Sequence, residues 1–111
     1  MNPVIFFTTV ENKKKAQSIG NHQVKNRLAA CVNIISNIES IYYWKDQLHQ
    51  DSEFLLMIKS DASKKENIQK IFDNYHPYDL PELIMVTIDD GSVEYLEWMK
   101  QNLGKEMEMD E

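Results

Sequence analysis

The stretch Cys31-Val-Asn-Ile-Ile-Ser-Asn-Ile-Glu-Ser-Ile-Tyr-Tyr-Trp44 decides the fold. β-Branched and aromatic residues dominate it, which is typical of a strand, and successive side chains of a strand point to opposite faces. Its apolar residues occupy both faces, with Val32, Ile34, Ile38, Tyr42 and Trp44 on one and Ile35, Ile41 and Tyr43 on the other. We therefore predict a long strand with a bend or bulge near Ser36-Asn37. At least one of its faces must meet another layer or another subunit.

Three further strands are predicted around this one. Val4-Ile-Phe-Phe7, extended by Thr8-Thr-Val10, is a continuous apolar run that predicts a strand buried on both faces. Residues 46–51 are predicted to form the tip of a hairpin, after which residues 54–58 return as a second buried strand ending at Lys59. Residues 83–88 are predicted to form the fourth strand.

Helical periodicity fills the gaps between these strands. A first helix is predicted from about Asn12 to Leu28. Ser63 and Glu66 form a capping-box pattern before a second helix, which Pro77 ends. The inward positions of that helix are predicted to be Ile68, Ile71, Phe72 and Tyr75. Ser92 is expected to cap a last helix that stops at Gly104, with Tyr95, Leu96, Met99 and Leu103 inward. The order βαββαβ with an additional C-terminal helix predicts an α+β, ferredoxin-like fold with an antiparallel sheet.

Composition sets the broad class of protein. The 111 residues suit a single domain, 1–111, in which residues 105–111 are expected to fray. The net charge of −6 argues against a nucleic-acid partner, because nucleic-acid binders carry a basic face. Cys31 is the only cysteine, which fits a reducing cytoplasm, and the sequence contains no apolar run long enough to span a membrane. We therefore expect a cytoplasmic protein with neither nucleic acid nor membrane as a partner.

The segment His76-Pro-Tyr-Asp-Leu-Pro-Glu-Leu83 is a proline-bounded turn that carries an imidazole, a phenol and two carboxylates. Together with the stretch from Leu28 to Trp44 it resembles the CutA family, the divalent-cation tolerance proteins, and the resemblance extends from about Val4 to Leu103. It implies a homotrimer in which the hairpin packs across the neighbouring subunit, and a role in tolerance of divalent metal cations.

The sequence departs from the copper site assigned to some bacterial members of that family. Those members use a cysteine in the first strand and two adjacent histidines before the Pro-Tyr dipeptide. Here Thr8 stands at the cysteine position and Tyr75 at the first histidine, so only His76 remains. The hairpin glycine of the family is replaced by Gln47, which predicts a different or strained turn.

His76 is the leading candidate for chemistry, because Tyr78, Asp79 and Glu82 follow it closely. Imidazole with carboxylate suits copper, zinc or nickel, and we expect Cu(II) at His76 with Glu82 as the second donor. In the alternative interpretation, His76 and Tyr78 only fix a tight turn and Glu82 pairs with a lysine. Glycines occur only at positions 20, 91 and 104, and the three histidines have no HxxxH spacing, so phosphate-binding loops and helical zinc motifs are excluded.

Cys31 and Lys59 each have two interpretations. Cys31 is either a small buried hydrophobe or a nucleophile, and its position after a helix C-terminus disfavours a thiolate. Lys59 either extends its charged end to solvent or forms a charged pocket wall. The expected ligand-binding cleft lies between subunits and uses Cys31, Tyr43, Trp44, Lys59, His76, Tyr78 and Glu82.

Three function classes compete for this cleft. The first is metal binding, and the second is binding of a small-molecule effector by a trimeric regulator similar to the PII proteins. The third is a hydrolase or lyase with His76 as base, which lacks a nucleophile and an oxyanion-hole motif. We therefore expect a binding protein and not an enzyme.

Overall fold

The long strand forms as predicted and pairs with the strand after it. The computed structural model describes residues 1–104, in which β2 (Cys31–Trp44) and β3 (Gln47–Asp61) make an antiparallel hairpin. The pairing changes register between Ile35 and Ile38, where Asn37 has a φ of 60°. The bulge predicted near Ser36-Asn37 is therefore confirmed. The prediction for residues 105–111 lies outside the described residues.

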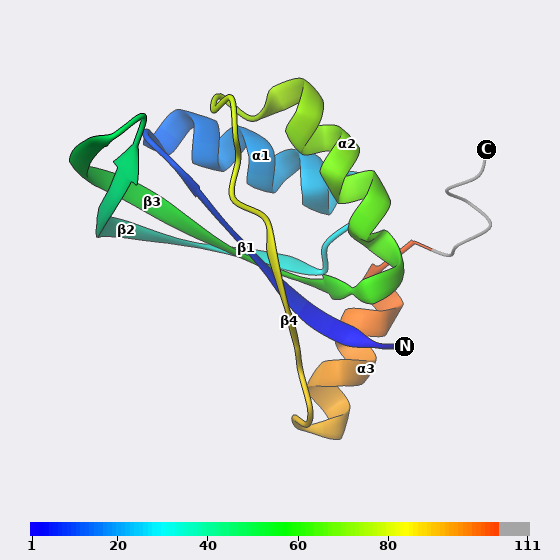
Figure 1. Ribbon diagram of the computed structural model, residues 1–111. Helices are drawn as coiled ribbons and strands as arrows, with labels where there is room; N and C mark the ends of the chain where they lie inside the picture. Colours follow the sequence, from blue (N-terminus) through cyan, green and yellow to red (C-terminus); the bar gives the residue numbers. More distant parts are fainter. Residues whose placement is uncertain (105–111) are drawn as a thin grey trace.

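Four strands form one antiparallel sheet in the order β2-β3-β1-β4. The central strands are β3 and β1 (Pro3–Val10), and the edges are β2 and β4 (Ile84–Thr87). The helices α1 (Lys13–Lys25) and α2 (Lys65–Tyr75) lie over one face of the sheet, while α3 (Val93–Asn102) lies apart from them (Figure 1). A short 3-10 turn, η1 (Ala62–Lys64), leads into α2. This arrangement confirms the α+β, ferredoxin-like fold with an added C-terminal helix. None of the helices within residues 1–104 has the length and apolar character needed to cross a membrane.

The core lies between the sheet and the helices α1 and α2. Alternate residues of β1 and β3 face it and meet the inner positions of both helices. The largest of these buried side chains are Phe6, Ile19, Leu56, Ile58, Ile68 and Phe72.

The prediction that β1 is buried on both faces was wrong for the single chain. Val4, Phe6, Thr8 and Val10 are buried, whereas the residues between them are only half-buried. The physical reason is that α1 and α2 cover one face of the sheet only (Figure 1). The apolar run therefore reflects a second apolar face of the sheet, which the single chain covers only in part.

The hairpin tip is tighter than predicted. Lys45 and Asp46 make the turn with φ values of 51° and 62°, and β3 begins at Gln47. Two successive residues in this left-handed region match the twist of the flanking strands, at some cost for residues other than glycine. Residues 47–51, predicted as part of the hairpin tip, instead continue the ladder, where Tyr42 pairs with His49 and donates a hydrogen bond to Asp51.

Helix boundaries and faces required three corrections. The first helix ends at Lys25, because Arg27 has a φ of 59°. No capping box forms at Ser63, since the Asp61 side chain accepts the Ser63 backbone N–H at 3.0 Å and caps η1 instead. Tyr75 and Tyr95 are exposed and do not point inward, and the Tyr75 ring stacks on His22 at 4.6 Å.

Candidate functional site

The loop of residues 76–83 leaves the end of α2 in a fixed direction. The His76 backbone N–H donates to Phe72 at 2.9 Å, as the last bond of the helix. His76 then takes an extended conformation with φ −73° and ψ 135°, because the following Pro77 disfavours helical geometry at this position. The imidazole is thereby directed onto β1.

Both ring nitrogens of His76 are occupied. The Tyr78 backbone N–H donates to Nδ1 at 3.2 Å, which places the ring proton on Nε2, and Nε2 lies 3.0 Å from Thr8 Oγ1. Burial lowers the pKa of His76 below its ordinary value, although bonding to the Thr9 backbone and the charge of Glu53 act in the opposite direction. His76 is therefore neutral at pH 7, and a metal ion can bind it only if one of these two hydrogen bonds is released.

Tyr78 ties the loop to β3 through a buried carboxylate. Its hydroxyl donates to Glu53 Oε2 at 2.5 Å, and Glu53 is only 6 % exposed. Burial, followed by this bond and the charge of Glu53, raises the pKa of Tyr78 above its usual range. Burial and the charge of Glu53 also raise the pKa of Glu82. Glu53 is thus the electrostatic centre of this region.

A cleft of about 960 Å³ opens between the hairpin and this loop. Five carboxylate side chains and three aromatic side chains are among those that line it: Glu11, Asp51, Glu53, Asp79, Glu82, Tyr42, Trp44 and Tyr78. Within residues 1–104, no three or more His, Cys, Asp or Glu side chains lie close enough together to hold a metal ion. The cleft of a single chain is therefore acidic without being a finished metal site.

Glu53 is a candidate site residue that the sequence pattern did not indicate. Its signal was a single carboxylate directly before the apolar run Phe54–Ile58, a position that is compatible with an ordinary strand end. Only its burial and its bond to Tyr78 distinguish it from the other acidic residues of the hairpin.

The structure separates the predicted cleft residues into three groups. Trp44, Tyr78 and Glu82 line the acidic cleft, with His76 beside it. Cys31 and Lys59 lie opposite each other at the far end of the β2–β3 ladder. Trp44 lies thirteen positions after Cys31 on β2, which is roughly 40 Å along a straight strand. Tyr43 is 74 % exposed near the hairpin tip and does not line the cleft.

The Lys59 end has polar contacts of its own. Lys59 Nζ lies 3.4 Å from Tyr95 Oη and 5.4 Å from the centre of that ring, so α3 packs on the face that α1 and α2 leave open. Cys31 is half-buried, and its Sγ lies 3.8 Å from Asn33 Oδ1. This end presents a cation where the other end presents carboxylates.

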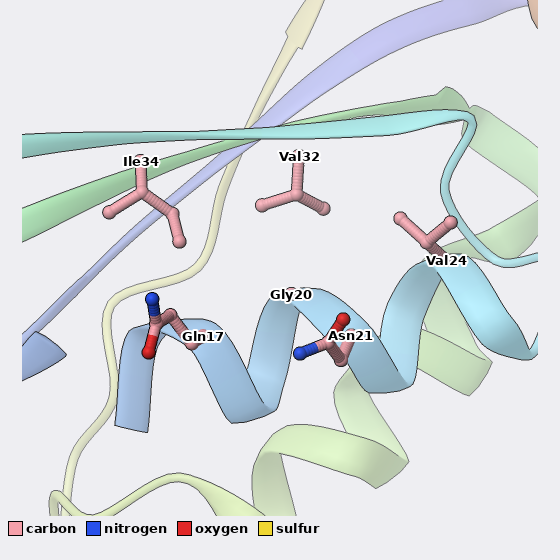
Figure 2. A pocket seen from close by; sticks show the side chains of 6 residues that line it. All are labelled: Gln17, Gly20, Asn21, Val24, Val32 and Ile34. Atoms are coloured by element: carbon pink, nitrogen blue, oxygen red, sulfur yellow. The ribbon is translucent and has the colours of Figure 1, made fainter. Parts of the chain in front are cut away.

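A second hollow of about 530 Å³ lies between α1 and β2. Figure 2 shows Val32 and Ile34 pointing from β2 toward α1, with Val24 facing them from the helix. Gly20 keeps the two elements close, because a Cβ there would meet Val32 Cγ1 at 3.3 Å. None of the predicted site residues lines this hollow.

Comparison with known proteins finds relatives that match most of the chain. Residues 4–102 match the family described as CutA1 divalent ion tolerance protein. The chloroplastic protein CutA of Arabidopsis thaliana is 40% identical over 99 residues, covering 89% of this chain and 54% of the plant protein. The divalent-cation tolerance protein CutA of Thermus thermophilus is 35% identical over 100 residues, covering 90% of this chain and 97% of that protein. The chain therefore spans about half the length of the plant relative and nearly all of the bacterial one.

Solved structures agree with these sequence matches. The crystal structure of CutA1 from Oryza sativa superposes with a TM-score of 0.91 at 34% identity, covering 95% of this chain and 96% of that one. The resemblance noted in the sequence is thus confirmed by sequence and by structure. The chain belongs to the CutA1 family of divalent ion tolerance proteins.

Proposed function

We propose that this chain acts in divalent-cation tolerance as a cytoplasmic homotrimer that binds a divalent metal ion, with copper preferred. We propose binding without catalysis. The Cys31 thiol contacts the Asn33 amide oxygen at 3.8 Å, and an amide oxygen is not a base that activates a thiol. A lone cysteine suits a reducing compartment.

The observation that carries the metal proposal is the setting of His76. A neutral imidazole is a good ligand for copper, and Nε2 lies against Thr8, the position of the cysteine ligand proposed in some bacterial relatives. Glu82, on the same loop, is our candidate for the second donor. Because copper must displace the bond to Thr8 or to Tyr78, we expect modest affinity.

Calorimetric titration of the metal-free protein with Cu(II) tests this proposal. His76→Ala is expected to lower copper affinity about tenfold or more, which is the fall in metal affinity typical when a residue around a metal is replaced. His22→Ala and His49→Ala serve as matched controls and are expected to leave the affinity unchanged. Equal losses from all three variants would mean adventitious surface binding, because copper heads the affinity order at almost any nitrogen site.

The trimer proposal rests on the open apolar surface. Both edges of the sheet, β2 and β4, carry large exposed apolar side chains, and Val93 and Trp98 of α3 are also exposed. Exposed apolar surface of this extent and two unpaired sheet edges promote aggregation, and oligomerisation covers them. Closed threefold symmetry covers both edges in every subunit.

An alternative function is favoured by the separation of Lys59 and Cys31 from Trp44, Tyr78 and Glu82. One chain cannot combine these two groups, whereas neighbouring subunits of a trimer can, with one contributing the cation and the other the carboxylates. Such an inter-subunit cleft suits a small-molecule effector of a regulator similar to the PII proteins. A thermal-shift screen tests this alternative, because a ligand that binds only the folded state at one hundred times its Kd adds about 2.7 kcal/mol.

A further inference from the structure

The connection between β4 and α3 contains the one Asp-Gly pair of the sequence. Of the three glycines only Gly91 follows an aspartate, and none follows an asparagine. Asp90 and Gly91 are both exposed, and their connection lies at the opposite end of the molecule from α1 and α2 (Figure 1). Water therefore reaches this peptide unit.

The side chain of Asp90 is held against the next backbone nitrogen. The Gly91 N–H donates to Asp90 Oδ1 at 2.8 Å, so the carboxyl carbon Cγ lies one bond beyond the atom that contacts this nitrogen. Two reacting groups held together in this way react faster than groups that must first meet. Gly91 also has no Cβ to shield its nitrogen. The geometry therefore favours closure of a five-membered ring by the Gly91 nitrogen and Asp90 Cγ.

Ring closure and reopening convert aspartate into isoaspartate. The Gly91 nitrogen attacks Asp90 Cγ, the N–Cγ bond forms, and the bond from Cγ to its hydroxyl breaks. The amide proton and the hydroxyl leave as water, and the product is a cyclic succinimide. Water that opens the ring at Cγ restores aspartate, whereas water that opens it at the main-chain carbonyl carbon gives isoaspartate. One water molecule is released and one is consumed, so no oxidant or other reactant is needed.

The other described aspartates lack this combination of features. Asp51 accepts from the Tyr42 hydroxyl, and Asp61 accepts from the Ser63 backbone N–H, so neither carboxylate is directed at its own following nitrogen. All of these other aspartates are followed by a residue with a side chain: Asp46, Asp51, Asp61, Asp73, Asp79 and Asp89. Within residues 1–104, the reaction is therefore expected at Asp90.

Isoaspartate at position 90 alters a short connection between two fixed points. The Ile88 backbone N–H donates to Pro3 at 3.0 Å. Ser92 caps α3, because its Oγ accepts the Tyr95 N–H at 3.3 Å. In isoaspartate the chain runs through Cβ and Cγ, which adds one backbone atom between these points. The added atom displaces Ser92 from the first turn of α3.

We propose that Asp90 is a site of spontaneous isomerisation to isoaspartate through a succinimide formed with Gly91, and that the product loosens the first turn of α3. The proposal depends on neither the metal nor the effector function given above.

Peptide mapping of the full chain after prolonged incubation at physiological temperature tests the proposal. A carboxyl methyltransferase specific for isoaspartate, supplied with labelled S-adenosylmethionine, measures the amount of product. Electron-transfer fragmentation locates the product, because it breaks the Cα–Cβ bond of isoaspartate. We expect isoaspartate at position 90, with the other described aspartates unchanged.

Gly91→Ala tests the role of the unshielded nitrogen. Gly91 does not have a positive φ, and a Cβ there would meet only Leu96 side-chain atoms at 3.6 Å, which is an ordinary contact. The fold therefore accommodates alanine, whose methyl group is expected to slow isomerisation about tenfold or more. Asp90→Glu is expected to abolish the product, because the corresponding ring needs six members. Asp89→Glu, one position earlier, is the matched control and is expected to leave the rate unchanged.

Hydrogen exchange tests the effect on α3. The amide hydrogens of Tyr95 and Leu96, which are bonded to the Ser92 side chain and carbonyl, are expected to exchange faster in the isomerised chain. Unchanged exchange would overturn the claim that the product loosens α3. No product at Asp90, equal product at several aspartates, or equal rates in Gly91→Ala and the unaltered chain would overturn the assignment of the site.

Discussion

The bond between Tyr78 and Glu53 gives the sharpest prediction about the site. Tyr78→Phe removes the hydroxyl that lies 2.5 Å from Glu53 Oε2 and leaves the ring in place. Because Glu53 is only 6 % exposed, water cannot fully replace the lost donor. The variant therefore removes a single interaction from a nearly buried anion.

The size of the effect follows from the type of bond. Hydrogen bonds to charged groups contribute about 1.5–3 kcal/mol to stability. Tyr78 is only half-buried, so solvent screening places the expected loss near the lower end, at about 1–2 kcal/mol of unfolding free energy. Tyr75→Phe is the matched control: it removes an equivalent hydroxyl from a side chain that is 55% exposed, and it is expected to change stability by less than about 0.5 kcal/mol.

Urea unfolding at pH 7 and fixed protein concentration measures these differences, since oligomer stability depends on concentration. A double-mutant cycle with Glu53→Ala, which removes both carboxylate oxygens, isolates the pair and is expected to give a coupling of about 1 kcal/mol or more. A coupling near zero, or equal effects of Tyr78→Phe and Tyr75→Phe, would refute the claim that Glu53 holds the loop.

Three other perturbations have defined outcomes. Glu82→Gln is expected to stabilise the metal-free protein at pH 7 by a few tenths of a kcal/mol, because folding raises the pKa of Glu82 and disfavours its charged form. The stability contributed by protonated Glu82 is present below its unfolded pKa of about 4.3 and is lost as pH rises through the folded pKa. The difference in unfolding free energy between Glu82→Gln and the unaltered protein, measured in urea, should therefore vanish below about pH 4. Gln23→Met is expected to add about 1–3 kcal/mol to the unfolding free energy, since the buried Gln23 amide has no hydrogen-bond partner within residues 1–104; unchanged or reduced stability would contradict this. Trp44→Ala is expected to weaken assembly more than the fold, because Trp44 is 40% exposed in the single chain, and an unchanged oligomer mass on size exclusion would make it an ordinary surface residue.

The order of strands and helices could be predicted because each element carries a local signal. The β-branched and aromatic content of residues 31–44 identified the longest strand, and Pro77 identified the end of α2. The errors occurred where distant contacts decide the conformation. Residues 47–51, predicted as part of the hairpin tip, extend β3, because cross-strand partners such as Tyr42 hold them in the ladder.

Candidate site residues were harder to predict, because proximity across the sheet is not encoded locally. His76, Tyr78 and Glu82 are close in sequence, and the turn between two prolines marked them. Glu53 lies far from them along the chain and approaches Tyr78 only through the fold. The separation of Lys59 from Trp44 likewise becomes visible only when β2 and β3 are paired.

Both candidate functions are assigned to a homotrimer, and the effector-binding alternative requires a site formed between its subunits. Light scattering coupled to size exclusion at micromolar concentration tests this claim most directly. We predict a single stable species with three times the chain mass of 13.1 kDa. A stable species at 13.1 kDa would contradict the account, because the exposed apolar surface would then have no partner and the two halves of the site could not meet.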